Sequence, residues 1–204
     1  MNLSVIKQYF EPESILDIGS NTGGFYSDCI KVFPNSYYYL IDGNVNCEDA
    51  LKNLNVDYSI SLLSDIEKDV DFYTRTNEPN CSGNSIYREK TQYFDDNEIT
   101  IIKKRTQTLE KLLGDKHFDL IKLDVQGSEL DIIRGGLNII KRAKGLILEV
   151  AVVEYNENAP LIDEVYEYMK TINFTPVEKI GINLKPATYE LVQEDILFIN
   201  NILL

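Results

Sequence analysis

The sequence SILDIGSNTGG spans residues 14–24, and it decides the fold class. A short apolar run ends in a glycine-containing turn, and a helix-like pattern begins at about Thr22. Strand, tight glycine turn and helix N-terminus follow one another in this way in nucleotide-binding α/β domains. Glycine lets the backbone approach a ligand because it has no Cβ, and unpaired N–H groups at a helix N-terminus favour an anionic group. We therefore expect Gly19, Asn21 and Gly23 to bind a cofactor.

The glycine spacing and a preceding acidic residue indicate the kind of cofactor. A dinucleotide-binding turn has the pattern G-x-G-x-x-G, whereas this chain has G-x-x-x-G-G from Gly19 onward. Asp17 lies two residues before Gly19, and its carboxylate suits a cationic or amine-bearing ligand better than a pyrophosphate. The turn therefore favours S-adenosylmethionine over NAD, and Asp17 joins the residues expected to bind it.

Short apolar runs alternate with amphipathic segments along most of the chain. We expect strands at residues 15–18, 37–41, 58–63, 118–124, 145–152, 174–179 and 195–200. We expect helices at residues 22–33, 47–54, 109–113, 128–142 and 160–172. This alternation predicts one Rossmann-like, doubly wound α/β domain over residues 1–204, with a mostly parallel, seven-stranded sheet and helices on both faces. The last strand is expected to be antiparallel, because no full helix precedes it.

Two further strand-like runs, residues 70–73 and 99–106, flank the least regular part of the chain. Between them lies a polar loop, residues 76–85. This loop is either functional or a disordered surface insertion. Gly135 and Gly136 lie inside the predicted helix at 128–142, where each costs roughly 1 kcal/mol relative to alanine. We therefore expect close packing against another backbone at these glycines.

The overall charge limits the partners of this chain. Its 204 residues are 44% hydrophobic, which suits a single domain with a sizeable core, and the net charge is −13. A nucleic-acid partner or an anionic membrane surface would need a basic footprint, and the sequence has none. No apolar run approaches the ~20 residues that span a bilayer. Three cysteines without metal-ligand spacing and the lack of a signal peptide lead us to expect free thiols and a cytoplasmic location.

Polar side chains follow several of the predicted strands. In open α/β sheets, ligands bind at the carboxyl ends of the strands, so these side chains are expected to converge. The residues expected there are Asp17, Asp42, Ser64 with Asp65, Asp124 and Glu149. Such a convergence of acids indicates a binding site for a ligand that carries hydroxyl and amine groups.

Asp42 lies 23 residues after Gly19, at the end of the second predicted strand. An acid at this point accepts hydrogen bonds from both hydroxyls of a ribose. A turn-forming role before Gly43 is compatible with that function. Asn44 either assists in binding the ribose or caps the next helix.

Asp124 follows the fourth main strand and should lie beside the glycine turn. It would hold the amino group of a methionine moiety, act as a general base or ligate a metal. Lys122 shares its face of the strand, since side chains alternate, and it either forms a structural ion pair or tunes Asp124. Glu149, flanked by apolar residues, is either a base, a metal ligand or a satisfied buried carboxylate.

Several stretches together resemble the FkbM family of S-adenosylmethionine-dependent methyltransferases. The most specific is DLIKLDVQGSEL at residues 119–130. The others are LDIGSNTG at 16–23, TQTLEKL at 106–112, LEV at 148–150 and EDILFI at 194–199. The resemblance covers residues 14–200, with Gln126 where the family usually has Glu, and Asp42 with Gly43 where it often has Glu-Pro.

The resemblance implies transfer of a methyl group from S-adenosylmethionine to an oxygen, typically a hydroxyl on a sugar, glycan or secondary metabolite. Asp124 is then the first candidate for the base, Glu149 the second, and Lys122 supports them. Ser64, Asp65 and Gln126 are further candidates for cofactor binding. A small-molecule or saccharide acceptor is expected, whereas an Mg²⁺ requirement and assembly into a homo-oligomer stay open. The alternatives are a non-catalytic nucleotide-binding protein and, less favoured, an NAD-dependent oxidoreductase.

Overall fold

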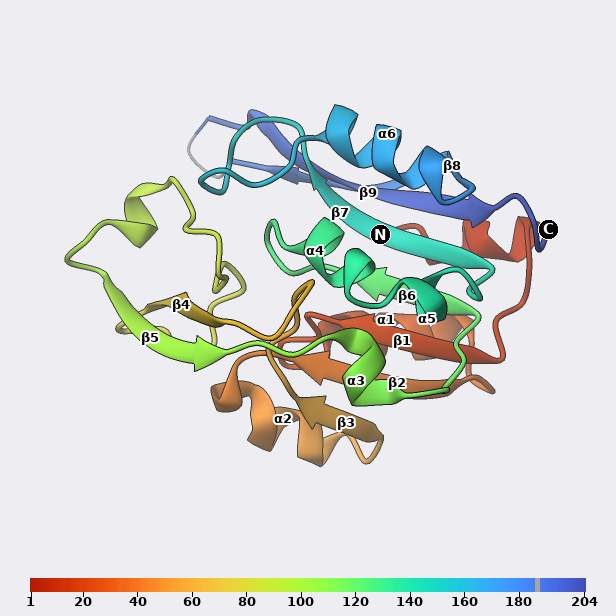
Figure 1. Cartoon of the computed structure of the whole chain (residues 1–204), viewed down its shortest axis with the longest axis horizontal. Coiled ribbons are helices and arrows are strands. Elements are labelled where there is room, and N and C mark those ends of the chain that lie inside the picture. The colour runs from red at the N-terminus through yellow and green to blue at the C-terminus, as the bar shows by residue number, and fades with distance from the viewer. Residues whose placement is uncertain (186–187) are drawn as a thin grey trace.

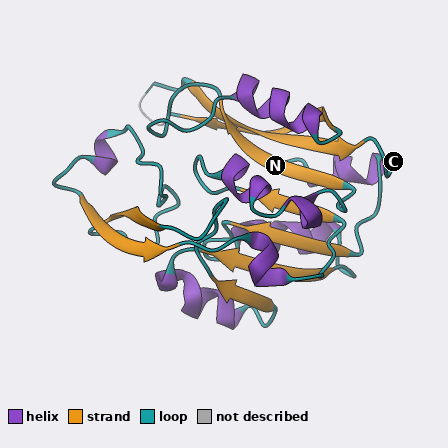
Figure 2. Ribbon diagram, in the orientation of Figure 1, coloured by secondary structure: helices purple, strands orange, loops and turns teal. Residues whose placement is uncertain are grey.

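The computed structural model describes residues 1–185 and 188–204. Its main feature is a seven-stranded sheet with the strand order β3-β2-β1-β6-β7-β9-β8 (Figures 1 and 2). The strands are β1 (Ser14–Ile18), β2 (Tyr37–Asp42), β3 (Asp57–Ile60), β6 (Leu120–Leu123), β7 (Gly145–Ala151), β8 (Phe174–Leu184) and β9 (Leu191–Asn200). Strands β3, β2, β1, β6 and β7 pair in parallel, whereas β9 runs antiparallel to β7 and β8. The predicted fold class and the antiparallel last strand are confirmed.

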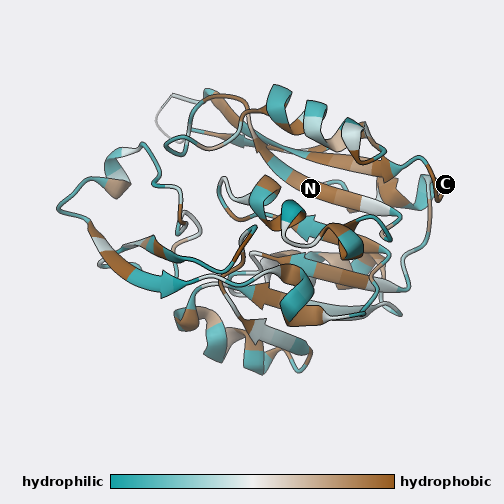
Figure 3. Cartoon of the chain, in the orientation of Figure 1, coloured by the Kyte–Doolittle hydropathy of each residue, from teal (hydrophilic) through white to brown (hydrophobic). Residues whose placement is uncertain are grey.

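Helices cover both faces of this sheet. Alternate residues of each strand point to opposite faces, so the apolar side chains form two hydrophobic cores. On β1, Ile15 packs with the short N-terminal helix η1 and with α1, whereas Leu16 packs with α3 to α6. Hydrophobic residues accordingly dominate the central strands (Figure 3). The helices are η1 (Leu3–Gln8), α1 (Gly24–Val32), η2 (Val45–Cys47), α2 (Glu48–Asn53), α3 (Leu109–Leu113), α4 (Glu129–Arg134), α5 (Leu137–Ile140) and α6 (Ile162–Thr171). In the part of the chain that the structure describes, no helix is long and apolar enough to span a membrane.

The strand-like runs at 70–73 and 99–106 form a separate antiparallel ribbon. It consists of β4 (Asp69–Arg75) and β5 (Ile99–Arg105), which extend away from the main sheet at the left of Figure 1. The irregular segment between them, residues 76–98, includes a short helix, η3 (Gln92–Phe94). This segment lies near the carboxyl ends of the parallel strands, where the predicted site is.

The single helix predicted at 128–142 is wrong, because the chain forms α4 and α5 with a break at Gly135 and Gly136. A Cβ on Gly135 would lie 2.2 Å from the backbone oxygen of Ser64, and one on Gly136 would lie 2.6 Å from Leu109. Close packing against another backbone is therefore confirmed at Gly135, whereas Gly136 packs against the side chain of Leu109, and both accompany a break in the helix.

Candidate functional site

The glycine turn after β1 packs tightly against the end of β6. The backbone N–H of Gly19 donates to the oxygen of Ile41 at 2.8 Å, and that of Asp124 donates to the oxygen of Ile18 at 3.0 Å. Gly19 has φ +82°, and a Cβ there would lie 1.8 Å from the backbone oxygen of Asp124. Any side chain at position 19 would therefore separate the ends of β1 and β6, so the glycine is needed to bring them together.

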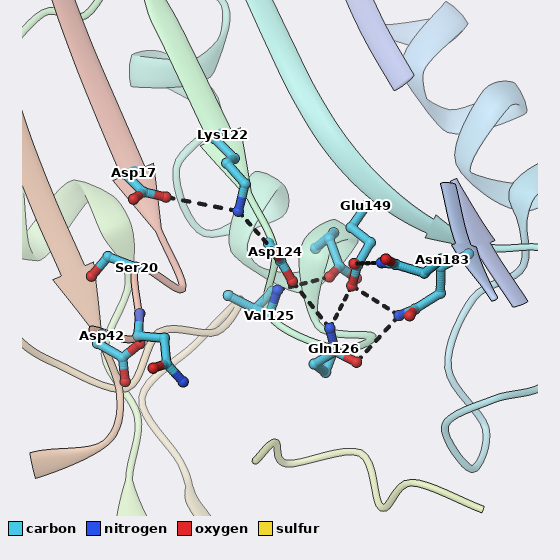
Figure 4. Close-up of polar contacts among 12 residues, drawn as sticks. Asp17, Ser20, Asp42, Lys122, Asp124, Val125, Gln126, Glu149 and Asn183 are labelled. Atoms are coloured by element: carbon cyan, nitrogen blue, oxygen red, sulfur yellow. Dashed lines mark hydrogen bonds and ion pairs between the residues drawn. The ribbon is translucent and has the colours of Figure 1, made fainter. Parts of the chain in front are cut away.

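Asp17 and Lys122 lie opposite each other on the paired strands β1 and β6, on the same face of the sheet. Both are buried, and Lys122 Nζ lies 3.9 Å from Asp17 Oδ1 and 2.9 Å from Asp124 Oδ2 (Figure 4). Among the described residues, neither oxygen of Asp17 accepts a hydrogen bond. Burial raises the pKa of Asp17 to about 6, and the charge of Lys122 offsets this only in part. The Asp17 carboxylate is thus buried without a donor.

Asp124 has the opposite environment. Its Oδ2 accepts a hydrogen bond from Lys122, and its Oδ1 accepts one from Gln126 Nε2 at 3.0 Å. Burial raises the pKa of Asp124, but Lys122 and these hydrogen bonds outweigh it, so the pKa lies below its ordinary value. Burial lowers the pKa of Lys122, and the neighbouring carboxylates reverse that shift. Asp124 and Lys122 therefore form a charged pair inside the site.

Glu149, near the end of β7, is surrounded by carboxamide donors. Its two oxygens accept hydrogen bonds from Gln126, from Asn183 on β8 and, at 2.9 Å, from Gln193 on β9 (Figure 4 shows the cluster). Burial and then the charge of Asp124 raise the pKa of Glu149 well above its ordinary value. Gln126 thus joins the two predicted catalytic carboxylates, because its amide nitrogen donates to both.

Gln193 and Asp195 are residues of this cluster that the sequence analysis missed. Asp195 pairs in register with Glu149, and burial raises the pKa of Asp195 to about 6. The two-residue spacing puts Gln193 and Asp195 on one face of β9, but the strand expected at 195–200 begins after Gln193. Only the position of β9 beside β7 shows that these two side chains belong to the site.

Asp42 ends β2 and supports the glycine turn. Its Oδ2 accepts the backbone N–H of Asn21 at 2.7 Å, and its Oδ1 accepts that of Asn44 at 2.7 Å. Burial raises its pKa despite both hydrogen bonds. Each oxygen keeps acceptor capacity for a further hydroxyl, since a carboxylate has about four lone-pair sites. Asn44 also caps the following turn, because its side chain accepts the N–H of Asn46.

Two cavities meet at the glycine turn, since Gly19, Asn21 and Asp124 line both. The first extends over Asp42 and Asn44 towards residues 61–63, and the second extends past Lys122 and Phe25. Other site predictions lie outside these linings. Asp17, Gln126 and Glu149 are buried beneath them, and Gly23 is the N-cap residue of α1. Ser64 donates to Asp65, which pairs with Lys68. Together the two cavities form an elongated space across the carboxyl ends of β1, β2 and β6.

The loop at 76–85 closes the first cavity. Asn21 Nδ2 donates to the oxygen of Asn80 at 3.0 Å, and Asn44 Nδ2 donates to that of Pro79. At the far end of the loop, Ser85 Oγ donates to the oxygen of Gln126 at 2.9 Å. Residues 81, 82 and 84–86 line the cavity, although no sequence motif pointed to them. The loop is therefore part of the site.

Metal-ligand geometry is not found in the site. Within residues 1–185 and 188–204, no group of three or more His, Cys, Asp or Glu side chains is arranged to hold a metal ion. The acids at the carboxyl edge pair instead with Lys122, with backbone N–H groups and with carboxamides.

The sheet order, the glycine turn after β1 and the acid at the end of β2 define a Rossmann-like α/β protein with a ligand site at the carboxyl edge. The family model described as the methyltransferase FkbM domain matches residues 17–176. The chain therefore belongs to the FkbM methyltransferase family. The comparison with curated proteins finds no match.

Solved methyltransferase structures share the fold. Magnesium protoporphyrin IX methyltransferase from Synechocystis PCC 6803, with bound SAM, aligns with a TM-score of 0.55 and 10% identity over 97% of this chain and 74% of that one. Precorrin-6y C5,15-methyltransferase from Geobacter metallireducens aligns at 0.52 and 11% over 97% and 85%. The 1,6-didemethyltoxoflavin-N1-methyltransferase from Burkholderia thailandensis, with bound S-adenosylhomocysteine, aligns at 0.51 and 11% over 97% and 76%. At these identities the likeness concerns the fold alone.

Proposed function

We propose that this protein is an S-adenosylmethionine-dependent O-methyltransferase that acts on a hydroxyl of a sugar, glycan or secondary metabolite. The observation that carries the proposal is the elongated space at the carboxyl edge, where Asp42 lines one part and Lys122, the partner of buried Asp17, lines the other. Membership of the FkbM family and the bound SAM and S-adenosylhomocysteine in structures of the same fold support it.

The residues present fit this cofactor. Asp42 has acceptor capacity for ribose hydroxyls, and the first cavity continues past it along Leu62, Leu63 and Phe72, which suit an adenine ring. Asp17 has two buried oxygens that accept no hydrogen bond from the described residues, so an ammonium group or a water bound to it would supply the missing donor. Lys122 and Asp124, which line the second cavity, complete a surface for the methionine part.

When bound, the cofactor would supply a methyl group on a sulfonium: a C–O bond would form to the acceptor, the S–C electron pair would stay on sulfur, and the hydroxyl proton would pass to a base. Asp124, whose pKa is lowered, stays ionised and positions the positive charge. Glu149 is the better proton acceptor of the two, because burial and the charge of Asp124 raise its pKa whereas the pKa of Asp124 is lowered. Lys122 holds Asp124 in place, and Gln126 links Asp124 to Glu149.

The proposal is tested by incubating the purified protein with methyl-labelled S-adenosylmethionine and a panel of hydroxylated sugars and metabolites, with and without Mg²⁺. We expect a labelled product that survives mild alkali, as a methyl ether does and a methyl ester does not. Glu149→Gln should lower kcat by about 10²–10⁴-fold, the usual contribution of a general base. The matched control Asp49→Asn, on the exposed side of α2, should leave kcat unchanged. Label found on carbon or nitrogen would contradict O-methylation.

A further inference from the structure

A third cavity lies beside the first, on the side of the long insertion. Cys81 and Ser82 line both cavities, so the two are neighbours. Its walls come from the insertion at 75–94, from Tyr155 in the segment after β7, and from Lys185 after β8. The proposed cofactor contacts leave this cavity unused, and its lining includes Lys185, two residues after Asn183, whose side chain donates to Glu149.

The charge of this cavity differs from that of the rest of the chain. Arg75, Lys90 and Lys185 line it, and Glu89 is the single acid of the lining among the described residues. The whole sequence has 20 basic residues against 33 acidic ones. Arg75 pairs with Glu78 and Lys90 with Glu154, while Lys185 forms no ion pair within the described part of the chain. Among the described residues, Lys185 is therefore the cation of this lining that is left to meet an anion, and Arg75 would have to share its charge with Glu78.

The inner wall of the cavity is suited to hydroxyl groups. Glu89 is only 6% exposed and accepts a hydrogen bond from the hydroxyl of Thr91, and Tyr155 lines the same cavity. A buried carboxylate with acceptor capacity left over binds neighbouring hydroxyls of a sugar in the same way as Asp42 would bind a ribose.

An aromatic ring faces the cavity from its rim. Tyr93 is 44% exposed, and the guanidinium carbon of Arg75 lies 5.4 Å from the centre of its ring, which fixes the ring on one side. The free side offers an amphipathic face against which a sugar ring packs. The Nε of Arg75 is buried and has no acceptor among the described residues, so this guanidinium has unused hydrogen-bonding capacity.

We propose that this cavity holds the methyl acceptor, and that the acceptor is a sugar ring carrying a carboxylate or a phosphate. This inference rests on the proposed function and narrows its substrate class. Tyr93 packs against the ring, Glu89 and Tyr155 bind its hydroxyls, and Arg75 and Lys185 bind the anionic group. The loop residues Cys81 and Ser82 then separate acceptor and adenosine, and the reacting hydroxyl lies on the side of Glu149.

The experiment is an NMR titration of the full-length ¹⁵N-labelled protein, saturated with S-adenosylhomocysteine, with glucose, glucuronate and glucose 6-phosphate. We expect saturable shifts at the amides of Arg75, Thr91 and Tyr93 with one or both anionic sugars. Glucose should bind about tenfold more weakly, since a hydrogen bond to a charged group is worth about 1.5–3 kcal/mol. Comparing the two anionic probes identifies the carboxylate or the phosphate as the preferred group.

Matched variants locate the binding site. Lys185→Gln and Tyr93→Ala should each weaken the anionic sugar by about fivefold or more, whereas Lys103→Gln, whose side chain on β5 is 80% exposed outside the cavity, should not. The inference is overturned if neither anionic sugar causes saturable shifts. It is also overturned if Lys185→Gln and Tyr93→Ala leave the affinity for the anionic sugar unchanged. The affinity for S-adenosylhomocysteine is measured first in every sample. If the wild-type protein does not bind S-adenosylhomocysteine, the proposed function is refuted. If it binds S-adenosylhomocysteine but no sugar, only the acceptor site is refuted.

Discussion

Asp17 and Asp119 are both buried aspartates within 4 Å of a lysine, at opposite ends of the parallel strands, yet their surroundings differ. Asp119 precedes β6, and its carboxylate accepts hydrogen bonds from the backbone N–H of Glu13 at 2.8 Å and from His117. It also forms an ion pair with Lys144 at 3.0 Å. Burial alone would raise its pKa, but these partners lower it below its ordinary value. Asp17 accepts no hydrogen bond among the described residues, and its pKa is raised to about 6.

This difference separates a carboxylate whose partners all lie within the chain from one that we propose is completed by a ligand. At the amino end of the strands, Asp119 ties the N-terminal segment to β6, and all its partners belong to the chain. At the carboxyl end, Asp17 is desolvated without full compensation, which costs stability in the ligand-free protein. A site that binds a cationic group has such an acid because the ligand supplies the missing partner.

The largest effect is expected from removing Lys122, the lysine beside Asp17. Lys122→Met leaves Asp17 and Asp124 buried without their cation, so the free energy of unfolding should fall by about 3–5 kcal/mol. Lys144→Met, at the other end of the sheet, should cost about 1 kcal/mol or less, since the Lys144 side chain is 36% exposed and Asp119 keeps its other partners. Urea denaturation measures both. Equal losses would contradict the distinction between the two ends.

The two aspartates should respond in opposite directions to conversion into asparagine. Asp119→Asn weakens an ion pair and charge-assisted hydrogen bonds, so the free energy of unfolding at pH 7 should fall by about 1.5–3 kcal/mol. Asp17→Asn removes a poorly compensated buried charge and should raise it by about 1–3 kcal/mol, from a pKa shift of about two units. If thermal and urea unfolding show Asp17→Asn to be the more damaging change, Asp17 has a structural role.

A smaller effect is expected in the dependence of stability on pH. Between about pH 4 and 6, the folded protein binds a proton at Asp17 that the unfolded chain has released, so stability falls as the pH rises. Asp195 and Glu129, with pKa values raised to about 6 and about 7, add to this slope. The lowered pKa of Asp119 acts oppositely, since its contribution is present above pH 4 and lost as the pH falls further.

The same pair of variants sharpens this comparison. Asp17→Asn should reduce the slope between pH 4 and 6, and Asp119→Asn should reduce the loss of stability below pH 4, both measured as melting temperatures. A slope between pH 4 and 6 that is unchanged in Asp17→Asn would show that Asp17 titrates with its ordinary pKa.

The sequence predicted those parts of the site that depend on local patterns. Apolar runs located the ends of β1, β2 and β6, so Asp17, Asp42 and Asp124 could be placed together at one edge. The expected end of β3 at residue 63 is wrong, because the strand stops at Ile60 and its residues are only partly buried. The first cavity is accordingly lined by residues 61–63 and not by Ser64 and Asp65, which were expected there.

Other features depend on contacts between distant segments and have no local signal. The antiparallel insertion of β9 places Asp195 beside Glu149, 46 residues earlier in the sequence. Likewise, the loop at 76–85 closes over the site through hydrogen bonds to Asn21 and Asn44. Polar loop residues are compatible with many docking positions, so only the three-dimensional arrangement showed which one they adopt.

The central claim, that the carboxyl edge binds S-adenosylmethionine, is tested most directly by isothermal titration with S-adenosylhomocysteine. We predict micromolar binding to the wild-type protein, a loss of at least about tenfold in Asp42→Ala, since that carboxylate would bind the ribose through charge-assisted hydrogen bonds, and no change in the exposed control Asp49→Ala. Absence of binding to a folded wild-type sample, or equal binding to both variants, would contradict the account.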